Sequence, residues 1–475
     1  MRRLALLLLA ALLGCGPDSP LRDAVREESA HERYARALRD AGLDQAALGR
    51  DWLRAAEGAL SAAAPVTLPF REAGYFAESE ARAVAYRVRL RRGQRIVAAV
   101  ETQGATPARL FIDLFEPPTP DDSLARPRRV ASADSGALRV AVEAERDGDY
   151  LVRLQPELLR GVRWTLTLSA EASLAFPVAG KDSRAVQSVF GVARDGGRRS
   201  HQGIDIFARR GTPVLAAGAG IAYASDNQLG GKVVWVRDPL RGRSLYYAHL
   251  DSQTVGAAER VEAGDTLGFV GNTGNARTTA PHLHFGIYRR GEGALDPYPF
   301  VHQPRGSVAV LAADTAAFGA WRRVAARRGA ALRVGPDDRA AVVDTLPART
   351  ALRVEGASGR YYRVRLPDGS GGYLAAAGTA SAETPVARTR AARPEAVRDR
   401  PTRVAATVDS VQSGSAVPVL GRFGEFLLVR TAGGRTGWRA ANCRGRGAPP
   451  AGDAPRPFYR PRCGARTVSR AGRGA

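Results

Sequence analysis

The sequence predicts a mainly β, multidomain protein in which a helical hairpin precedes a β-sandwich, an antiparallel β domain and two small barrels. Three observations carry this prediction. From about residue 68 apolar and polar residues alternate with a period of two, as in half-buried strands. Residues 176–300 combine short apolar pairs with many Gly and Pro, which is typical of strands joined by tight turns. Residues 321–443 contain one pattern twice.

The composition is that of a globular protein with a large excess of arginine. The chain has 475 residues, 44% hydrophobic and 25% charged, with a net charge of +23. These values exclude a wholly disordered or fibrous chain and allow several domains. Of the 70 basic residues only Lys181 and Lys232 are lysines, which indicates arginine-biased coding. The basic surplus favours polyanionic surroundings such as an anionic membrane or a cell wall. We find no nucleic-acid-binding motif and expect no nucleic-acid partner.

Residues 1–15, MRRLALLLLAALLGC, are typical of a secretory signal peptide, with two arginines before an apolar run too short to span a bilayer. Leu12 to Cys15 resembles the bacterial lipobox, which implies cleavage before Cys15 and lipidation of its thiol. The alternative is an ordinary signal peptide. Gly16 after the cysteine resembles lipoproteins sorted to the outer membrane. Outside the cytoplasm Cys443 and Cys463 could form a disulfide, or remain two free thiols.

Two helices are expected in residues 16–65. Ser19-Pro20 is a helix-start signal and Gly42 a stop signal, while Asp44 could cap a second helix that runs to about Ala63. We expect this hairpin to be a spacer between the lipid anchor and the first domain, with His31 on its solvated face.

The segment 66–172 is predicted to be a jelly-roll-like β-sandwich, because short alternating segments are separated by turn residues. It resembles, weakly, the modules found beside secreted peptidases. The expected strands are 86–90, 96–100, 110–115, 138–142, 150–154 and 164–168.

Two repeats follow a linker at 301–320. The offset is 65 residues, the distance from Leu332 to Val397, and each copy ends in Gly plus an aromatic residue, Gly372-Tyr373 and Gly437-Trp438. Both copies resemble bacterial SH3-like barrels, which implies a cell-wall or protein ligand; a structural spacer is the alternative. The predicted boundaries are 321–377 and 395–443, with a linker at 378–394 and a flexible tail at 444–475.

Four of the six histidines lie between residues 201 and 284. His201 and Asp205 are four residues apart, whereas His282 and His284 fall on one face of a strand because side chains alternate. His249 lies between these motifs. Catalytic zinc typically has three N or O ligands from the protein and an open position for water, and two imidazoles with one carboxylate would supply that set.

In order and spacing, these motifs resemble those of the lysostaphin-type (LytM-like) zinc metallopeptidases. The resemblance covers residues 187–288 and includes the lead-in residues Phe190-Gly191 and Arg194. It implies that one Zn²⁺ is bound by His201, Asp205 and His284, and that His249 and His282 are catalytic. Gly286 departs from the family, in which Glu is common at this position. Tyr247 is expected near the site or in the core, and His302 on the surface.

The predicted function is that of a lipid-anchored, zinc-dependent peptidoglycan endopeptidase that hydrolyses stem-peptide or crosslink bonds. The expected location is the periplasmic face of the outer membrane, with peptidoglycan as the substrate and the membrane reached through lipidated Cys15. The alternative is a catalytically inactive cell-wall-binding regulator that activates a peptidoglycan amidase. Because every metal ligand is present, the enzyme is favoured.

Overall fold

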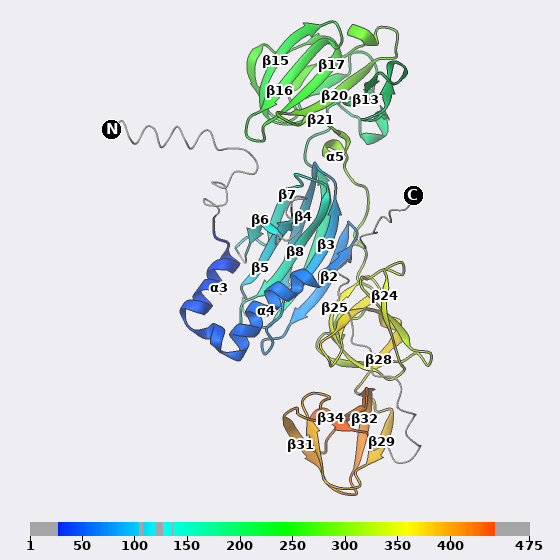
Figure 1. The fold of residues 1–475 in the computed structure, drawn as a ribbon. Coiled ribbons are helices and arrows are strands. Elements are labelled where there is room, and N and C mark those ends of the chain that lie inside the picture. The colour runs from blue at the N-terminus through cyan, green and yellow to red at the C-terminus, as the bar shows by residue number, and fades with distance from the viewer. Residues whose placement is uncertain (1–26, 104–107, 119–126, 135, 442–475) are drawn as a thin grey trace, which may run out of the picture.

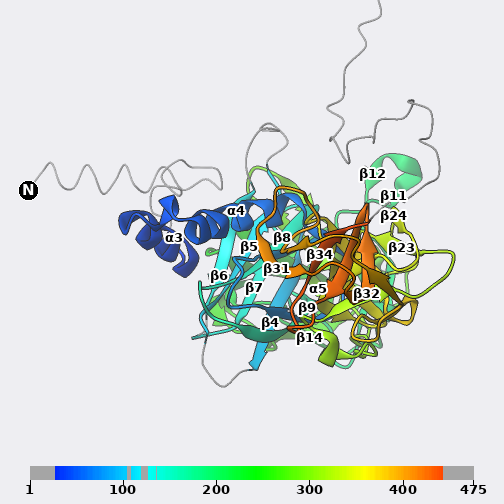
Figure 2. The ribbon, with the colours of Figure 1, turned by 90° about the horizontal axis from the view of Figure 1, so that it is seen from below.

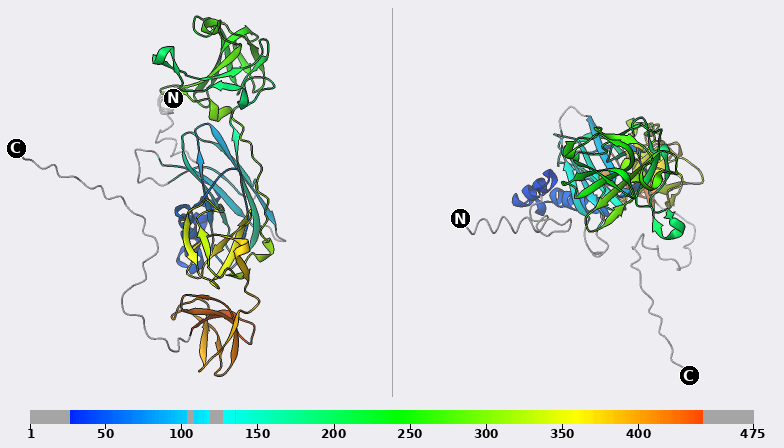
Figure 3. Two further views of the ribbon diagram at one scale, coloured as in Figure 1. Left: turned by 90° about the vertical axis from the view of Figure 1, so that its right-hand side faces the viewer. Right: turned by 90° about the horizontal axis from the view of Figure 1, so that it is seen from above.

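The computed structural model describes residues 27–103, 108–118, 127–134 and 136–441. The sandwich lies in the middle, with the histidine-rich β domain at one end and the two barrels at the other (Figures 1 and 3). The mainly β, multidomain prediction is confirmed. Cys15, Cys443 and Cys463 lie outside the described residues, as do Ser19-Pro20 and the tail 444–475. Among the described residues no helix combines the length and apolar character needed to cross a bilayer.

The N-terminal helical hairpin is α3 (Ala30–Asp40) and α4 (Ala47–Ser61), joined by a 3₁₀ turn at Leu43–Gln45. Ser29 caps α3 in a reciprocal capping box with Glu32. Asp44 lies in the 3₁₀ turn and Ala46 precedes α4, so the expected Asp44 cap is wrong.

The hairpin packs against the side of the sandwich, and its described part is not a free spacer (Figure 2). Trp52 is fully buried between the helices and Phe111 of the sandwich, where its indole N–H donates to the Pro156 carbonyl at 2.8 Å. The apolar stripe of α4 thus serves to bury the helix on its neighbour.

The expectation that His31 is solvated is wrong. His31 is 6% exposed and stacks on Trp52 with the ring centroids 4.7 Å apart. Its Nε2–H donates to Gln155 Oε1 at 2.7 Å, and its Nδ1 accepts from the Arg153 guanidinium at 3.0 Å. A second proton on the ring would face that guanidinium. Burial, followed by the Arg153 charge, therefore lowers the pKa of His31 to about 4.

We expect acidification to loosen α3. Between the unfolded pKa of about 6.5 and the folded pKa of about 4, unfolded His31 binds more protons than folded His31, so stability falls as the pH drops through this window. From pH 7 to 4.5 the free energy of opening α3 should fall by about 2–3 kcal/mol, a loss that His31→Gln should abolish. Amide hydrogen exchange across α3 measures this difference, and equal pH dependence in both proteins would contradict it.

The sandwich consists of two facing sheets whose shared core includes Tyr86, Tyr150 and Trp164. One sheet has the order β1–β3–β8–β5–β6: Ala64–Val66, Val84–Leu90, Gly148–Pro156, Leu110–Glu116 and Arg128–Ala133. The other contains β2, β9, β4 and β7: Phe70–Phe76, Val162–Ala172, Gln94–Gln103 and Arg139–Glu143. Strands β1, β2 and β6 are additional to the six predicted segments.

The histidine-rich domain is built on one antiparallel sheet. Its main path is β10 (Val186–Ser188), β13 (Ile204–Phe207), β20 (His282–Arg289), β17 (Arg243–Gln253), β16 (Gly231–Asp238), β15 (Gly220–Asn227) and β18 (Ala257–Val261). The remaining elements are β14 (Pro213–Leu215), β19 (Thr266–Val270), β21 (Gly293–Leu295), the hairpin β11–β12 (Ala193–Arg194, Arg199–Ser200), α5 (Tyr298–Val301), and 3₁₀ turns at Ser183–Ala185, Asp195–Gly197 and Gly274–Ala276.

Ion pairs fasten this domain to the sandwich at the Arg289 end of β20. Arg289 contacts Glu145 at 2.7 Å and Arg243 contacts Glu143 at 2.6 Å. His282 begins the strand, about 24 Å from Arg289 at about 3.4 Å per residue. The sandwich is therefore docked at the end of β20 that lies away from the histidines.

The two barrels repeat one another element by element. The first contains β22–β28: Trp321–Val324, Ala330–Arg333, Val342–Leu346, Ala351–Ser358, Tyr361–Arg365, Gly371–Ala375 and Thr379–Ser381, with 3₁₀ turns at Thr315–Ala317 and Ala376–Gly378. The second contains β29–β34: Ala387–Arg390, Glu395–Arg398, Thr407–Val411, Ala416–Phe423, Phe426–Arg430 and Thr436–Ala440. Five strands of each barrel share the predicted offset, and the Arg333–Tyr373 bridge recurs as Arg398–Trp438.

The expected linker at 378–394 contains strands of both barrels. β28 pairs with β22 of the first barrel, and β29 pairs with β32 of the second. Two barrels joined this closely leave little free chain between them.

The first barrel is joined to the sandwich by backbone pairing and a buried carboxylate. β25 pairs with β2 of the sandwich. Glu72, fully buried, accepts from the hydroxyls of Tyr86 at 2.9 Å and Tyr373 at 2.6 Å, and lies 3.1 Å from Arg363 Nε. A carboxylate bonded from both modules fixes how they meet.

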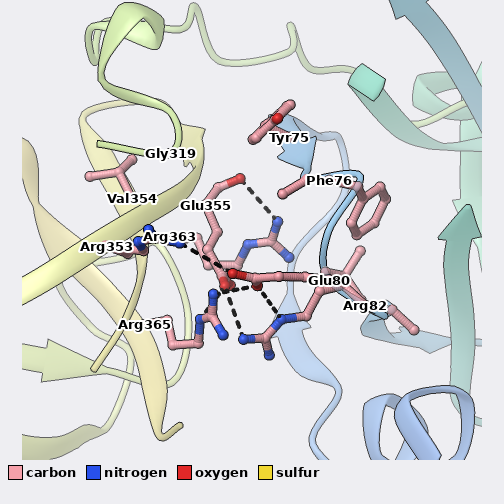
Figure 4. Close-up of a pocket in the computed structure, with 13 residues that line it drawn as sticks. Tyr75, Phe76, Glu80, Arg82, Gly319, Arg353, Val354, Glu355, Arg363 and Arg365 are labelled. Atoms are coloured by element: carbon pink, nitrogen blue, oxygen red, sulfur yellow. Dashed lines mark hydrogen bonds and ion pairs between the residues drawn. The ribbon is translucent and has the colours of Figure 1, made fainter. Parts of the chain in front are cut away.

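A small pocket lies beside this junction (Figure 4). Its charged side chains pair across the two modules: Arg365 contacts Glu80 and Glu355 at 2.6 Å each, and Arg82 of the sandwich contacts Glu80 at 3.1 Å. Because both glutamates of the pocket are bound by arginines of the two modules, we assign the pocket a docking role.

Candidate metal centre

The three predicted ligands come together at the centre of the sheet. β13 pairs with β20 so that Asp205 lies directly opposite His284, and His201 lies three residues before the first residue of β13, Ile204. His201 Nε2, Asp205 Oδ1 and His284 Nδ1 are each 3.0 Å from the other two. One lone pair from each of the three residues therefore points to a common position. This is the arrangement of side chains that can bind a metal ion.

The environment of each ligand orients it. Asp205 Oδ2 accepts from the Arg194 guanidinium at 2.7 Å, and His201 Nδ1 donates to the Val189 carbonyl at 2.9 Å. These bonds leave Oδ1 and Nε2 for a metal. Gly203 is required here, because a Cβ at this position would lie 2.7 Å from His284 Nε2. Such outer contacts are typical of metal-binding His and Asp.

The electrostatics favour the unprotonated forms that bind metal. Burial raises the pKa of Asp205, but the adjacent His201 and His284 outweigh it and hold that pKa well below its usual range. Burial lowers the pKa of His284 despite its bond to Asp205. Neutral imidazoles and an ionised carboxylate are the ligand forms that zinc requires.

The donor set fits zinc. Two imidazole nitrogens and one carboxylate oxygen are zinc ligands in catalytic sites, with bonds of about 2.0–2.2 Å. Such bonds at tetrahedral angles place ligand atoms roughly 3.3 Å apart, so the observed 3.0 Å needs only a slight opening. Each ligand also has the outer hydrogen bond or packing contact that a zinc site uses.

His249 and His282 lie beside the ligands, and the Nδ1 atom of each bonds a backbone carbonyl. The ring centroid of His249 is 5.1 Å from that of His282 and 5.9 Å from that of His284. His249 Nδ1 donates to the Thr273 carbonyl at 2.9 Å, and His282 Nδ1 donates to the Ala280 carbonyl at 2.8 Å. Each ring therefore keeps its Nε2 lone pair free to accept a proton.

His249 is held in an unusual backbone conformation. Its φ is +64°, in the left-handed region that non-glycine residues rarely adopt, and its N–H donates to the Gly230 carbonyl at 2.8 Å. Strain of this kind clusters at functional sites. Burial, followed by the neighbouring His282 and His284, lowers the pKa of His249 to about 4, so the ring is neutral at pH 7.

Two flanking residues differ in how they fit the expectations. Tyr247 is fully buried in the core, where its hydroxyl accepts from the Ala217 N–H at 2.8 Å, which decides between the alternatives left open by the sequence. His302 is half-buried and stacks on Tyr298 at 5.0 Å, so it is not a free surface residue. The sequence identifies Arg194 only as a lead-in residue of the motif. It does not predict that the Arg194 guanidinium contacts the Asp205 carboxylate.

We expect Arg194→Gln to weaken zinc binding by about 10–100-fold, because Asp205 Oδ2 would lose its charged partner and the carboxylate could rotate. Competition with a chromophoric chelator measures the affinity. Arg209→Gln, which removes an exposed arginine of the same domain, should bind zinc like the unchanged protein. Equal affinities for the two variants would contradict the positioning role.

Comparison with known proteins finds similarity in the part of the chain that contains these residues. Residues 199–297 match the model of peptidase family M23, and residues 328–380 match that of the bacterial SH3 domain. The L-Ala--D-Glu endopeptidase of Bacillus subtilis is 37% identical over 137 residues, which are 26% of this chain and 42% of that protein. The peptidoglycan DD-endopeptidase ShyC of Vibrio cholerae is 39% identical over 109 residues, 22% of this chain and 24% of that protein.

Among solved structures, the catalytic domain of lysostaphin from Staphylococcus simulans is 32% identical, with 24% of this chain and 87% of that chain covered and a TM-score of 0.22. The chain spans less than half the length of the two curated relatives, so the likeness concerns the histidine-rich domain. This protein therefore contains a domain of peptidase family M23 followed by a bacterial SH3 domain.

Proposed function

We propose that this protein is a zinc-dependent peptidoglycan endopeptidase, anchored through lipidated Cys15 to the periplasmic face of the outer membrane. The observation that carries the proposal is the convergence of His201, Asp205 and His284 beside two further histidines with free Nε2 atoms. A binding protein that had lost catalysis would have no need of this whole set. The relative named as a peptidoglycan DD-endopeptidase supplies the substrate class.

The three ligands would hold the metal, and zinc would supply a Lewis acid at the scissile carbonyl. His249 and His282, each with Nδ1–H bonded to the backbone, can accept a proton at Nε2 and return it to the departing amine. Both imidazolium forms could also stabilise negative charge on the carbonyl oxygen. Arg194 orients Asp205 through its hydrogen bond to Oδ2.

The barrels are proposed to bind the cell wall or a protein partner, as bacterial SH3 modules imply. The first barrel docks on the sandwich through β2 and β25, and both barrels lie at the end of the molecule opposite the histidine-rich domain (Figure 3). Binding there would therefore hold the peptidase domain at a distance from the attachment point.

The test is digestion of purified sacculi by residues 16–475 loaded with zinc, followed by chromatography of the muropeptides. We expect new uncrosslinked peptides, lost on treatment with a chelator and restored by zinc. Absence of any product from zinc-loaded protein would overturn the proposal. Stimulation of an amidase by a protein that itself releases nothing would support the regulator instead.

A further inference from the structure

Three rows of side chains cross the face of the sheet that carries the metal centre. The first row is Asp205, His284 and Ala248, which lie opposite one another on β13, β20 and β17. Because side chains on one face recur at every second residue, the next rows on this face lie two and four residues along β20. They are about 7 and 14 Å from the metal row.

The second row is aromatic. Gly286 lies opposite Tyr246, Tyr246 opposite Trp235, and Trp235 opposite Tyr223. The Trp235 and Tyr246 ring centroids are 4.4 Å apart, and Tyr246 is 5.9 Å from the ring of His284. Trp235 and Tyr223 are only half-buried. The row therefore offers ring surface that begins beside the metal ligands.

The third row contains two arginines, because it continues from Arg237 through Ile221 on β15 to Arg260 on β18. Tyr288 lies opposite Ser244, and Ser244 opposite Arg237. Arg237 is exposed, and its guanidinium lies over the Tyr223 ring at 4.7 Å. Within the described part of the chain it has no carboxylate partner, unlike Arg243 and Arg289, which pair with glutamates of the sandwich.

The charge balance of this face favours an anion. Asp205 is the single acidic side chain in the three rows, and its charge is committed to the metal centre. Gly286 adds no carboxylate, and a Cβ there would already lie 3.0 Å from Tyr288 and 3.2 Å from the Gln202 carbonyl. Positive charge is therefore in excess on these rows, because Arg237 has no carboxylate partner among the described residues and the row continues through Ile221 to a second exposed arginine, Arg260.

We propose that Arg237, together with the Tyr223–Trp235–Tyr246 row, is a substrate subsite for a carboxylate carried by the stem peptide. This inference rests on the proposed function. The Cα atoms of His284 and Arg237 are two strands and four residues apart, about 17 Å in a sheet, and an arginine reaches back by roughly 6 Å. The remaining distance of about 10 Å corresponds to three extended residues. The rings contact the intervening, uncharged part of the peptide.

The proposed subsite should distinguish two substrates that differ only in charge. One is the crosslinked tetrapeptide dimer with free carboxylates, and the other is the same dimer with those carboxylates converted to carboxamides. Arg237→Gln should raise KM for the carboxylate substrate about tenfold, since a charge-assisted hydrogen bond is lost, and should leave kcat within about twofold. KM for the carboxamide substrate should not change, and Arg237→Lys should restore part of the loss.

The control is Arg328→Gln, which removes an exposed arginine from the first barrel and should leave both KM values unchanged. The same comparison by calorimetric binding to the His249→Ala protein does not depend on turnover. Equal KM and equal binding for the unchanged protein and Arg237→Gln would overturn the subsite. If the unchanged protein cleaved neither dimer, the endopeptidase proposal would fail, and the binding data would still decide the role of Arg237.

Discussion

Replacing His249 with alanine is expected to lower kcat on peptidoglycan by a factor of about 10²–10⁴ while leaving one zinc ion per chain. His249 is not one of the three residues whose ligand atoms converge, so the metal site should stay intact. What the variant loses is the Nε2 lone pair that its bond to the Thr273 carbonyl leaves free. Muropeptide release and zinc content, measured on the same sample, test both parts.

His302→Ala is the matched control for this experiment. His302 is a half-buried histidine of the same region that bonds Ser183 at 3.0 Å, away from the ligands. Its loss should leave kcat unchanged. Full activity in His249→Ala would remove that residue from the proposed catalytic role, whereas loss of zinc would make it structural.

The second large effect is expected from His284→Ala, which should reduce bound zinc from one ion per chain to nearly none and abolish hydrolysis. Only two donors would remain, and catalytic zinc sites use three protein ligands. Asp205→Asn should lower zinc occupancy as well, because the amide lacks the negative charge that offsets the ion. Elemental analysis after dialysis against a weak chelator gives the stoichiometry.

A change in hydrolysis without a change in zinc content would argue against the ligand assignment. Circular dichroism should show that the His284 variant keeps its strands. The ligands lie at the surface of a core that contains Leu283 and Phe285 on the opposite face of β20. That core does not depend on the metal.

Elements with strong local periodicity are the ones that the sequence predicts well. The alternating segments of the sandwich become β3, β4, β5, β7, β8 and β9, and the 65-residue offset recurs in the strands of both barrels. Alternation specifies a strand because one face is buried, irrespective of the partner strand. The expected linker at 378–394 fails because β28 and β29 are short edge strands whose pairing partners lie far along the chain.

The candidate site divides in the same way. Its ligands could be chosen from the sequence, because zinc restricts the residue types and strand periodicity restricts which of them share a face. Arg194, Arg237 and the aromatic row could not. Arg194 reaches Asp205 from β11, and the roles of Arg237 and the row depend on register between β15, β16, β17 and β20. Only cross-strand pairing shows that Arg237 lies beside the aromatic row, whereas Arg243 and Arg289 meet glutamates of the sandwich.

By itself the sequence determined that the chain is mainly β, that one segment is repeated, and that His201, Asp205 and His284 have the spacing of metal ligands. The tertiary structure alone decided that His31 is buried, that Tyr247 belongs to the core, and that the first barrel docks on the sandwich through Glu72. The reason is physical: periodicity and ligand chemistry act within a few residues, whereas burial and charge pairing depend on which distant surfaces meet.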